Sequence, residues 1–557
     1  MPARRGTSFG EEPLNIEIQA QRIIGSALTQ DYLRGAGTAR TFYSGSHREL
    51  ASFRAKLTEV QRRFGRAERE AAAAALRPTS ERARARLARF VEEGGAMVTT
   101  GQQAGFLTGP LYTIHKALSA VRLADALERR LGIAVLPVFW VASEDHDWEE
   151  ANHAYLSRPG SAPTRFTLPG PASPAVPMSD RILEDGVRLV LDDVAEAIGK
   201  EGNASTVLTW IREAYRPGNT VGGAFGELLG TMLAEFDLCI ADAADPALKR
   251  ASAGVMKLAL EDAADLERLL RERCRVLEKA GYHAQVGVVE GATNVFYHAP
   301  GGRERLFRTK SGYEARDAGV QFTADGVNEA VDRDPGKFSP NVLLRPVVES
   351  AVFPTLAYVG GPGEIAYFAQ ITALFPTFGI RPPVVVPRGS ALLIDPVVRR
   401  LMGPLRVDTG DLTRPRHQLQ TELARREVPP SVTEALNRVR EAIAGGYEDA
   451  IDSATAIDPS LRGALGRLRN EILHRVGESE QKVVRGVKRR DGATMAQLDR
   501  VLDSLRPDGK PQDRVLNVIP FLARYGPDLL TRLADLLDPE LEEEAAGSPA
   551  NPVGIGV

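Results

Sequence analysis

The chain has 557 residues, which is long for a single hydrophobic core and predicts several structural units. Hydrophobic residues make up 43% of it and charged residues 26%, as in ordinary globular enzymes, and the formal net charge of -3 provides no global basic field for nucleic acid. The two cysteines, Cys239 and Cys274, form no CxxC pair, which argues against a disulfide framework or a thiolate zinc site.

The chain also carries no sequence signal for a membrane. Its amino-terminal sequence, MPARRGTSFGEEPLNIE, lacks the apolar stretch of a signal peptide. No run of about 18 or more apolar residues predicts a transmembrane helix. Together with the sparing use of cysteine, this composition predicts a cytoplasmic protein that binds neither membrane nor nucleic acid.

The first regular elements are helical. Residues 48–93 are rich in Ala, Arg and Glu, and within them REAAAAALRPTSERARARLARF predicts two helices interrupted near Pro78, with Ser80 as the N-cap of the second. The period then changes, because GGAMVTT at 94–100 is a short apolar run that is typical of a buried strand.

A strand, a loop, a helix and a second strand follow one another between residues 94 and 142. The loop covers 101–108, and we expect the helix to begin at Pro110 and to end at Gly132, since proline favours the first helical position. AVLPVFWVA at 134–142 predicts the second buried strand. This order predicts a βαβ unit with parallel strands and a right-handed crossover.

The middle of the chain predicts two insertions into this α/β core. Residues from about 160 to 235 contain the proline-rich stretch RPGSAPTRFTLPGPASPAVPMSD, which favours a loose or mobile connection. FDLCIADAADPALKR then returns to a strand and a turn, and helices are expected over 246–279. AQVGVV and ATNVFYHA alternate like antiparallel strands and predict a small sheet within the second insertion, around 280–340.

The last third of the chain predicts an end to the core and a helical arm. A helix is expected from about Gly363, and PPVVVPRGSALLI predicts one further buried strand, so the core covers 1–395. Residues 396–510 are highly charged and predict a helical, coiled-coil arm. Residues 511–557 should pack back on the core and end in a frayed tail after about Leu541.

Glycines and polar residues crowd the first strand-to-helix turn, TGQQAGFLTGPLYTIHKAL. Free N–H groups and the positive dipole end at a helix N-terminus suit phosphate, and glycines let the backbone approach a ligand closely. A histidine at this place can donate to phosphate oxygens. The alternative is a structural glycine turn with the histidine in the core. The candidate nucleotide-binding residues are Gly101, Gln102, Gln103, Gly109, Tyr112 and Lys116, with His115 as a catalytic residue.

Four ionisable side chains follow the second strand of the βαβ unit, in SEDHDWEEANH. They are Glu144, Asp145, His146 and Asp147. Repulsion among the carboxylates should raise some of their pKa values, and such a cluster can hold Mg²⁺, bind an ammonium group or act as a general base. The alternative is a solvated acidic helix start. Ligands of open α/β sheets bind beyond the carboxyl ends of the strands, so both turns should open into one crevice.

A third group of candidates lies in RPVVESAVFPTLAYVGGPGEIAYFAQ. Arg345 could form a fork-shaped contact with a carboxylate or phosphate. Tyr358 and Glu364 flank a glycine turn before a helix, where the alternative for Glu364 is an ordinary first-turn acid. Arg388, in VVVPRGS, lies at another strand end and is a weaker candidate.

These three segments resemble the best-marked blocks of the BshC family, which acts in bacillithiol biosynthesis. FYSG near the N-terminus, FSPNVLLRP, and RVLNVIPFLARYG near the C-terminus also resemble it, so the similarity covers nearly the whole chain. The resemblance implies a Rossmann-like core similar to class I aminoacyl-tRNA synthetases, inserted connective segments, and a coiled-coil arm that forms a homodimer. GPLYTIH aligns with the synthetase HIGH element, of which only His115 matches.

The resemblance also implies a reaction, the joining of cysteine to the amine of glucosaminyl-malate. Amide formation needs an activated carboxylate, so we expect ATP as the cofactor, or ADP bound as its product, with Mg²⁺ as a candidate metal ion beside the nucleotide. In this hypothesis His115 and the glycine turn hold the phosphates. Asp145, His146 or Asp147 holds the ammonium of cysteine or deprotonates the sugar amine, and Arg345 holds the malyl carboxylate. An adenylate and an acyl-phosphate route both remain open.

Two other functions are compatible with the sequence. One is a different nucleotide-dependent ligase or nucleotidyltransferase with the same fold, which an unbiased screen of amine acceptors would reveal. The other is a non-catalytic scaffold that binds nucleotide through its core and partners through its arm. Metabolite profiling of a deletion strain distinguishes the scaffold from a ligase, because a strain that lacks a mere scaffold need not accumulate the unligated amine.

Overall fold

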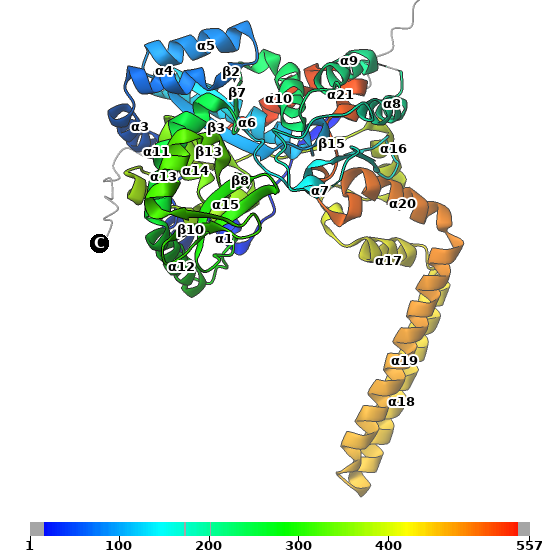
Figure 1. Ribbon diagram of the computed structural model, residues 1–557. Helices are drawn as coiled ribbons and strands as arrows, with labels where there is room; N and C mark the ends of the chain where they lie inside the picture. Colours follow the sequence, from blue (N-terminus) through cyan, green and yellow to red (C-terminus); the bar gives the residue numbers. More distant parts are fainter. Residues whose placement is uncertain (1–15, 172–173, 201, 544–557) are drawn as a thin grey trace, which may run out of the picture.

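The computed structural model describes residues 16–171, 174–200 and 202–543. An α/β core carries a helical hairpin that projects far from it (Figure 1). The frayed tail expected after Leu541 lies almost entirely outside the described residues. Within the described residues, no helix is long and apolar enough to cross a membrane.

A six-stranded sheet forms the centre of the core, and five of its strands run parallel. Its order is β14-β13-β3-β4-β7-β2, with β2 antiparallel at one edge. The strands are β2 (Leu76–Pro78), β3 (Ala96–Gln103), β4 (Val135–Ala142), β7 (Cys239–Asp242), β13 (Thr355–Gly360) and β14 (Val384–Pro387). The chain adds β4 and β7 on one side of β3, and later β13 and β14 on the other, so the strand order reverses between β3 and β13.

The βαβ unit predicted between residues 94 and 142 is present as β3, α6 (Tyr112–Leu131) and β4. The helix begins two residues after the expected Pro110, because Leu111 is its N-cap, and it ends at Gly132, whose φ of 67° is a left-handed cap. Val98 packs on one face of the sheet with α6, whereas Met97 packs on the other with Phe90. Both faces of the parallel sheet are therefore covered, as its continuous apolar strands require.

Helices before and after the βαβ unit complete the core. Ser80 caps α5 as expected, accepting a hydrogen bond from Ala83 N. The elements are β1 (Glu17–Ala20), α1 (Ala27–Leu33), α2 (Gly37–Arg40), α3 (Leu50–Arg63), α4 (Arg66–Ala74), α5 (Glu81–Glu92), α11 (Pro246–Glu261), α12 (Ala263–Lys279), α14 (Arg345–Val352) and α15 (Pro362–Ile371).

The first insertion is more regular than its composition predicts. The proline-rich part contains the short strand β6 (Thr164–Thr167) and is otherwise irregular where the structure describes it, and amphipathic helices follow it and bury their apolar faces in the core. Two short elements, α7 (Trp148–Ala151) and β5 (His153–Leu156), precede the insertion, which contains β6, α8 (Val187–Ile198), α9 (Ala204–Ala214) and α10 (Val221–Met232). The expectation of a loose connection was therefore wrong for the part of the insertion that forms α8, α9 and α10.

The second insertion contains an antiparallel sheet of order β11-β10-β9-β8-β12. ATNVFYHA forms β8 as predicted, but AQVGVV is not a strand, and β8 pairs instead with β9 and β12. The elements are β8 (Ala292–Ala299), β9 (Gly302–Arg308), β10 (Gly312–Ala315), β11 (Val320–Thr323), α13 (Ala324–Arg333) and β12 (Phe338–Pro340).

PPVVVPRGSALLI forms two strands rather than the single one predicted. The turn at Arg388 separates β14 in the large sheet from β15 (Ala391–Ile394), which pairs antiparallel with β1. The chain then enters α16 (Pro396–Leu405), α17 (Arg416–Arg426) and the hairpin of α18 (Pro430–Ile457) and α19 (Leu461–Arg490).

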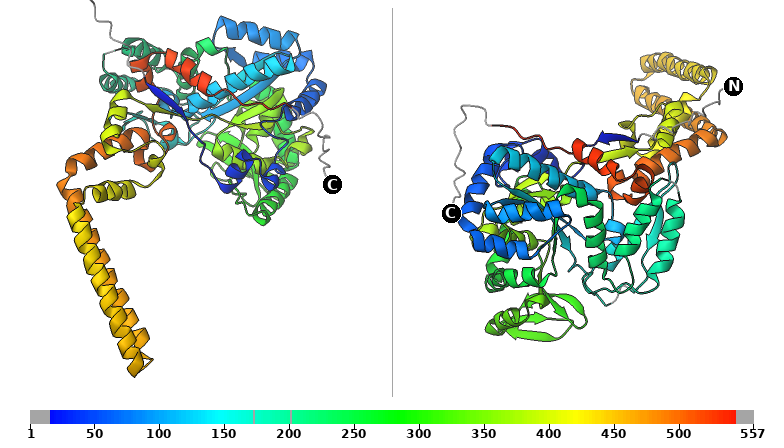
Figure 2. Two further views of the ribbon diagram at one scale, coloured as in Figure 1. Left: turned by 180° about the vertical axis from the view of Figure 1, so that it is seen from behind. Right: turned by 90° about the horizontal axis from the view of Figure 1, so that it is seen from above.

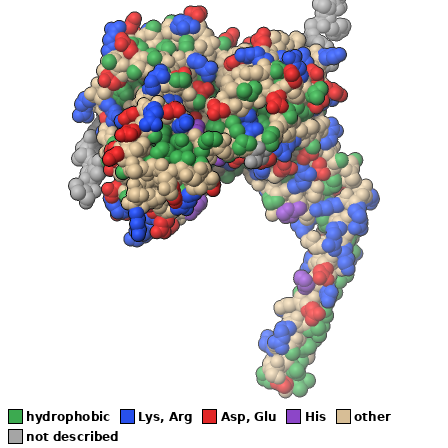
Figure 3. All heavy atoms as spheres, in the orientation of Figure 1, with side chains coloured by type: hydrophobic (Ala, Val, Ile, Leu, Met, Phe, Trp, Pro, Cys, Tyr) green, Lys and Arg blue, Asp and Glu red, His purple; other side chains and the backbone are tan. Residues whose placement is uncertain are grey.

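The chain returns from the hairpin through α20 (Gly492–Leu505), α21 (Ile519–Tyr525) and α22 (Asp528–Leu536). Figure 2 shows α21 and α22, in red, back against the core, and α22 packs on α6. On the face drawn in Figure 3, positive and negative side chains are interspersed over the core, and apolar side chains gather at the tip of the hairpin.

Candidate active site

A cavity of about 560 Å³ lies where the carboxyl ends of the parallel strands meet. Its wall comes from the ends of β3, β4 and β13, from the turn after β14, and from α6, α14 and α15, with β8 and β9 of the inserted sheet contributing as well. This is the place where the strand order reverses, which in open α/β sheets leaves a crevice for ligands. A second cavity of about 270 Å³ adjoins it, and both are lined by Gln102, Gln103, Tyr112, Asp145 and Arg514.

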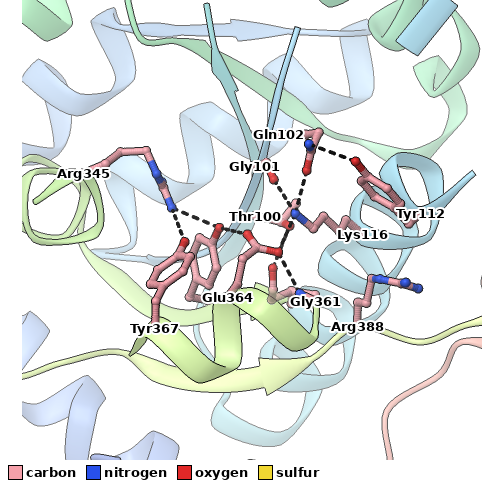
Figure 4. A network of polar contacts seen from close by, with 12 residues as sticks. Thr100, Gly101, Gln102, Tyr112, Lys116, Arg345, Gly361, Glu364, Tyr367 and Arg388 are labelled. Atoms are coloured by element: carbon pink, nitrogen blue, oxygen red, sulfur yellow. Dashed lines mark hydrogen bonds and ion pairs between the residues drawn. The ribbon is translucent and has the colours of Figure 1, made fainter. Parts of the chain in front are cut away.

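Lys116 ties the end of β3 to the first turn of α15 (Figure 4). Its ammonium group donates to Gly101 O and to Gln102 Oε1, both at 2.9 Å, and forms an ion pair with Glu364 at 2.5 Å. Burial lowers the pKa of Lys116. Burial would raise the pKa of Glu364, but Lys116, Tyr358 and the Gly361 N–H together lower it, so we regard the pair as ionised.

Arg345 is fixed by its own neighbours at the start of α14. It pairs with Glu349 at 2.6 Å and donates to the hydroxyls of Tyr358 at 3.1 Å and Tyr367 at 3.3 Å. Glu349 in turn accepts a hydrogen bond from Thr99 on β3. The charge of Arg345 is thus already compensated, although its side chain faces the main cavity.

The acidic loop after β4 divides its side chains between the two cavities. Glu144 is buried against Lys249 of α11, whereas Asp145 accepts hydrogen bonds from the Gln103 side chain and the His146 N–H. Asp147 is the N-cap of α7 and lines only the smaller cavity.

Burial sets the protonation of two side chains in this loop. Burial, and then the nearby Arg303, lower the pKa of His146, which favours the neutral imidazole. Burial and the charges of Asp147 and Asp145 raise the pKa of Glu150, as expected for crowded carboxylates. The loop therefore offers one neutral base and a group of carboxylates.

His115 lies outside both cavities, which corrects the expectation that it contacts phosphate. Its side chain is 0% exposed, and its Nδ1 atom lies 3.6 Å from Asp513, too far for a hydrogen bond. Burial lowers its pKa, which favours the neutral imidazole. His115 is therefore a core histidine, as the alternative interpretation held, because the face of α6 that carries it points away from the crevice.

Most of the other predicted residues do meet in one place. The main cavity is lined by Gly101, Gln102, Gln103, Tyr112, Lys116, Glu144, Asp145, His146, Arg345, Tyr358 and Glu364. Gly109 and Asp147 line the smaller one. The weaker candidate Arg388 lines the main cavity too, and its guanidinium pairs with Asp513 at 2.7 Å.

Several functional candidates were missed in the sequence. Phe296, Arg303 and Arg305 reach the main cavity from the inserted sheet, and Arg514 reaches it from the segment after the arm. The alternation of Arg303 and Arg305 along one strand could have marked a common face, but nothing in the sequence indicates which cavity that face meets. Within the described residues, no group of three His, Cys, Asp or Glu side chains is placed to hold a metal ion.

The fold and the site together define a Rossmann-like α/β protein with a charged ligand crevice at its strand reversal and a helical arm. Sequence profiles identify it further. The profile described as "Bacillithiol biosynthesis BshC, N-terminal Rossmann-like domain" matches residues 13–389, and the one for the C-terminal coiled-coil domain of BshC matches residues 391–543. The chain belongs to the BshC family.

Relatives named "Putative cysteine ligase BshC" match most of the chain. The protein of Koribacter versatilis is 33% identical over 91% of this chain and 94% of its own length. That of Solibacter usitatus is 33% identical over 92% and 95%, and that of Bacillus anthracis 29% identical over 80% and 83%. A solved structure from Campylobacter jejuni, titled "putative arginyl t-RNA synthetase", matches at 10% identity over 83% of this chain and 100% of its own, and its TM-score of 0.21 is too low to support an argument.

Proposed function

We propose that this chain joins the carboxyl group of cysteine to the amine of glucosaminyl-malate, using ATP to activate the carboxyl group. The relatives' printed name supports a cysteine ligase, and the family description supports bacillithiol biosynthesis. The observation that carries the proposal is that the two cavities adjoin. Gln103 at the end of β3 and Asp145 of the acidic loop after β4 line both cavities, and their side chains are hydrogen-bonded to each other.

The triphosphate would lie at the start of α6, across the wall shared by the two cavities. Gly109 and Thr113 line the smaller cavity there, and the buried Thr113 hydroxyl has no hydrogen-bond partner among the described residues. Lys510 and Arg514 add positive charge to the same wall. These groups suit a polyanion at a helix N-terminus, and they take over the role first expected of His115.

The reacting groups would meet in the main cavity beside Asp145 and His146. The sugar amine attacks the activated carbonyl carbon, the new C–N bond forms, and the phosphate-linked oxygen leaves with its electron pair. The proton released by the amine passes to a base. Neutral His146, 31% exposed and lining the cavity, suits that role, while Asp145 binds the ammonium group of the cysteine that is being joined.

Magnesium, if it accompanies the nucleotide, would be bound chiefly by phosphate oxygens. The described residues present no three-ligand site for it, whereas single carboxylates such as Asp147 line the cavity in which the phosphates are placed. Mg²⁺ in nucleotide sites commonly binds through one or two carboxylates and the phosphates, so the residues present are compatible with this arrangement.

Product formation tests the proposal. Purified protein is incubated with cysteine, ATP and glucosaminyl-malate, and bacillithiol is detected by mass, with omission of each substrate as a control. We expect ATP-dependent product in the wild type and a kcat lower by about 10²- to 10⁴-fold in His146→Ala. The exposed His283 provides the matched His283→Ala control, which should retain wild-type rates. Wild-type kcat in a folded His146→Ala protein would remove the base from the mechanism.

A further inference from the structure

The charges around the cavity form pairs, with two exceptions. Lys116 pairs with Glu364, Arg345 with Glu349, and Arg388 with Asp513. Lys249 pairs with Glu144, and Arg303 lies 3.9 Å from Asp145. Among the described residues, the guanidinium groups of Arg305 and Arg514 have neither a hydrogen bond nor an ion pair, although both line the main cavity.

Arg305 and Arg303 occupy alternate positions on β9, so both side chains lie on the same face of the inserted sheet. They share one aromatic platform. The Arg303 guanidinium lies 4.1 Å from the centre of the Phe296 ring, and that of Arg305 lies 5.4 Å from it. Register explains this arrangement, because Phe296 of β8 is directly opposite Arg305.

The two arginine side chains differ in how firmly their neighbours hold them. Arg303 is 8% exposed and is held by Ser339 Oγ at 2.9 Å and Pro340 O at 3.0 Å. Arg305 is half-buried, and among the residues that the structure describes it is held only by its contact with the Phe296 ring. A fixed guanidinium beside a free one forms a receptor for a planar anion to which both can donate hydrogen bonds.

We propose that Arg305, supported by Arg303, binds the malyl carboxylates of the acceptor and selects acceptors that carry them. The identity of the acceptor rests on the proposed function. Arg303 links this anion site to the reacting groups, because its Nη1 atom also lies 3.4 Å from His146 Nδ1. In glucosaminyl-malate the amine and the malyl group are on neighbouring sugar carbons, so carboxylates on Arg305 bring the amine towards His146.

Arg514 lies elsewhere in the cavity wall, so its substitution can be compared with that of Arg305. It comes from the segment after the arm and lines both cavities, where the nucleotide phosphates are placed. Arg305 lines only the main cavity. The two unpaired cations therefore serve different substrates, and their removal should affect different Michaelis constants.

Steady-state kinetics of Arg305→Ala, Arg305→Lys and Arg514→Ala test this assignment. Loss of a charged hydrogen-bond donor should raise the KM for glucosaminyl-malate by about 10- to 100-fold in Arg305→Ala, with kcat and the KM values for ATP and cysteine within about twofold of wild type. Arg305→Lys should give a smaller rise, because it keeps the charge but not the fork. Arg514→Ala should raise the KM for ATP instead.

Arg316→Ala is the matched control. Arg316 belongs to the same insertion and lies 3.7 Å from the centre of the Phe307 ring, but it pairs with Glu314 and does not line the cavity. Its kinetics should equal those of the wild type. Equal melting temperatures of all variants show that the changes are not effects of misfolding.

A neutral acceptor and free malate complete the test. An amino sugar without the malyl group should be used equally poorly by wild type and Arg305→Ala, and L-malate should raise the melting temperature of the wild type more than that of Arg305→Ala. An unchanged acceptor KM in Arg305→Ala, or a defect confined to ATP, overturns the assignment. If the wild type makes no bacillithiol, the proposed function fails, and malate binding alone then decides whether Arg305 forms an anion site.

Discussion

Asp513 shows how one buried carboxylate organises part of the site from a distant place in the sequence. It is 2% exposed, pairs with Arg388 and accepts a hydrogen bond from Ser390 Oγ at 2.9 Å. Burial would raise the pKa of Asp513, but His115, Arg388 and Ser390 together hold it well below its usual range. The carboxylate is thus ionised, and it holds the Arg388 guanidinium at the cavity wall.

Asp513→Asn should therefore destabilise the protein, because Arg388 is left buried without its counter-charge. We expect the free energy of unfolding to fall by about 3 kcal/mol, as measured by urea denaturation. Asp185→Asn, which removes an exposed pair with Arg188, should leave stability unchanged. Equal stability of Asp513→Asn and wild type would show that the Arg388 pair contributes nothing.

His298 predicts a dependence of stability on pH. Burial, and then the charges of Lys249 and Arg303, lower its pKa to about 3 from an ordinary value near 6.5. Below pH 6.5 the unfolded chain binds a proton that the folded protein excludes, so stability falls with pH until about pH 3. At pH 5 this group should lower the free energy of unfolding by about 2 kcal/mol.

The matching measurement compares urea unfolding at pH 7 and pH 5 in the wild type and in His298→Gln. The stability lost between the two pH values should be smaller by about 2 kcal/mol in the variant, since glutamine does not titrate. The same loss in both proteins would mean that His298 is protonated in the folded state at pH 5.

At the scale of elements, the turn between β3 and α6 stores backbone strain. Leu107 has a φ of 52° and Thr108 a φ of 70°, both in the left-handed region that disfavours residues other than glycine. Asn517 holds the turn by donating to Leu107 O at 2.8 Å and to Gly109 O at 2.6 Å, and the Tyr215 hydroxyl accepts from Leu107 N at 2.8 Å. The turn is fixed by residues far away in the chain.

Asn517→Ala should release this turn. Two buried carbonyl groups lose their donors, so the free energy of unfolding should fall by about 1–3 kcal/mol in a denaturant titration. The KM for ATP should rise as well, because Gly109 and Thr113 would no longer be held at the proposed phosphate site. A variant with reduced stability and an unchanged KM for ATP would separate the turn from nucleotide binding.

The same turn shows what sequence reasoning could and could not achieve. Its position was predictable, because an apolar strand, clustered glycines and Pro110 mark a strand-to-helix boundary. The orientation of His115 was not predictable, because every residue of α6 from Thr113 to Val121 is buried, and only the packing of α22 and Asp513 on that helix decides what His115 faces. Arg303 and Arg305 were unpredictable for a similar reason, because tertiary packing of the inserted sheet places them at the cavity.

At the scale of the whole molecule, the arm leaves apolar side chains uncovered. Its two helices have 28 and 30 residues, yet Ile457 is 85% exposed, Val439 48%, Leu468 45% and Leu461 38%. A hairpin alone cannot cover these side chains, whereas a second copy could. We therefore expect the homodimer implied by the family resemblance to form through the arm.

Replacement of these four residues by glutamine should convert the dimer to a monomer, as measured by size-exclusion chromatography with light scattering. The melting temperature of the core should change little, because the substituted side chains lie outside the large hydrophobic clusters. A wild-type monomer, or a variant that remains dimeric, would place the subunit contact elsewhere or exclude it.

The most direct test of the central claim is a crystal structure with cysteine and a nonhydrolysable ATP analogue. The account predicts phosphate density beside Gly109, Thr113 and Arg514 at the start of α6, with the cysteine next to Asp145 in the adjoining cavity. Ligands bound at any other place, in crystals of protein that makes bacillithiol, would contradict it.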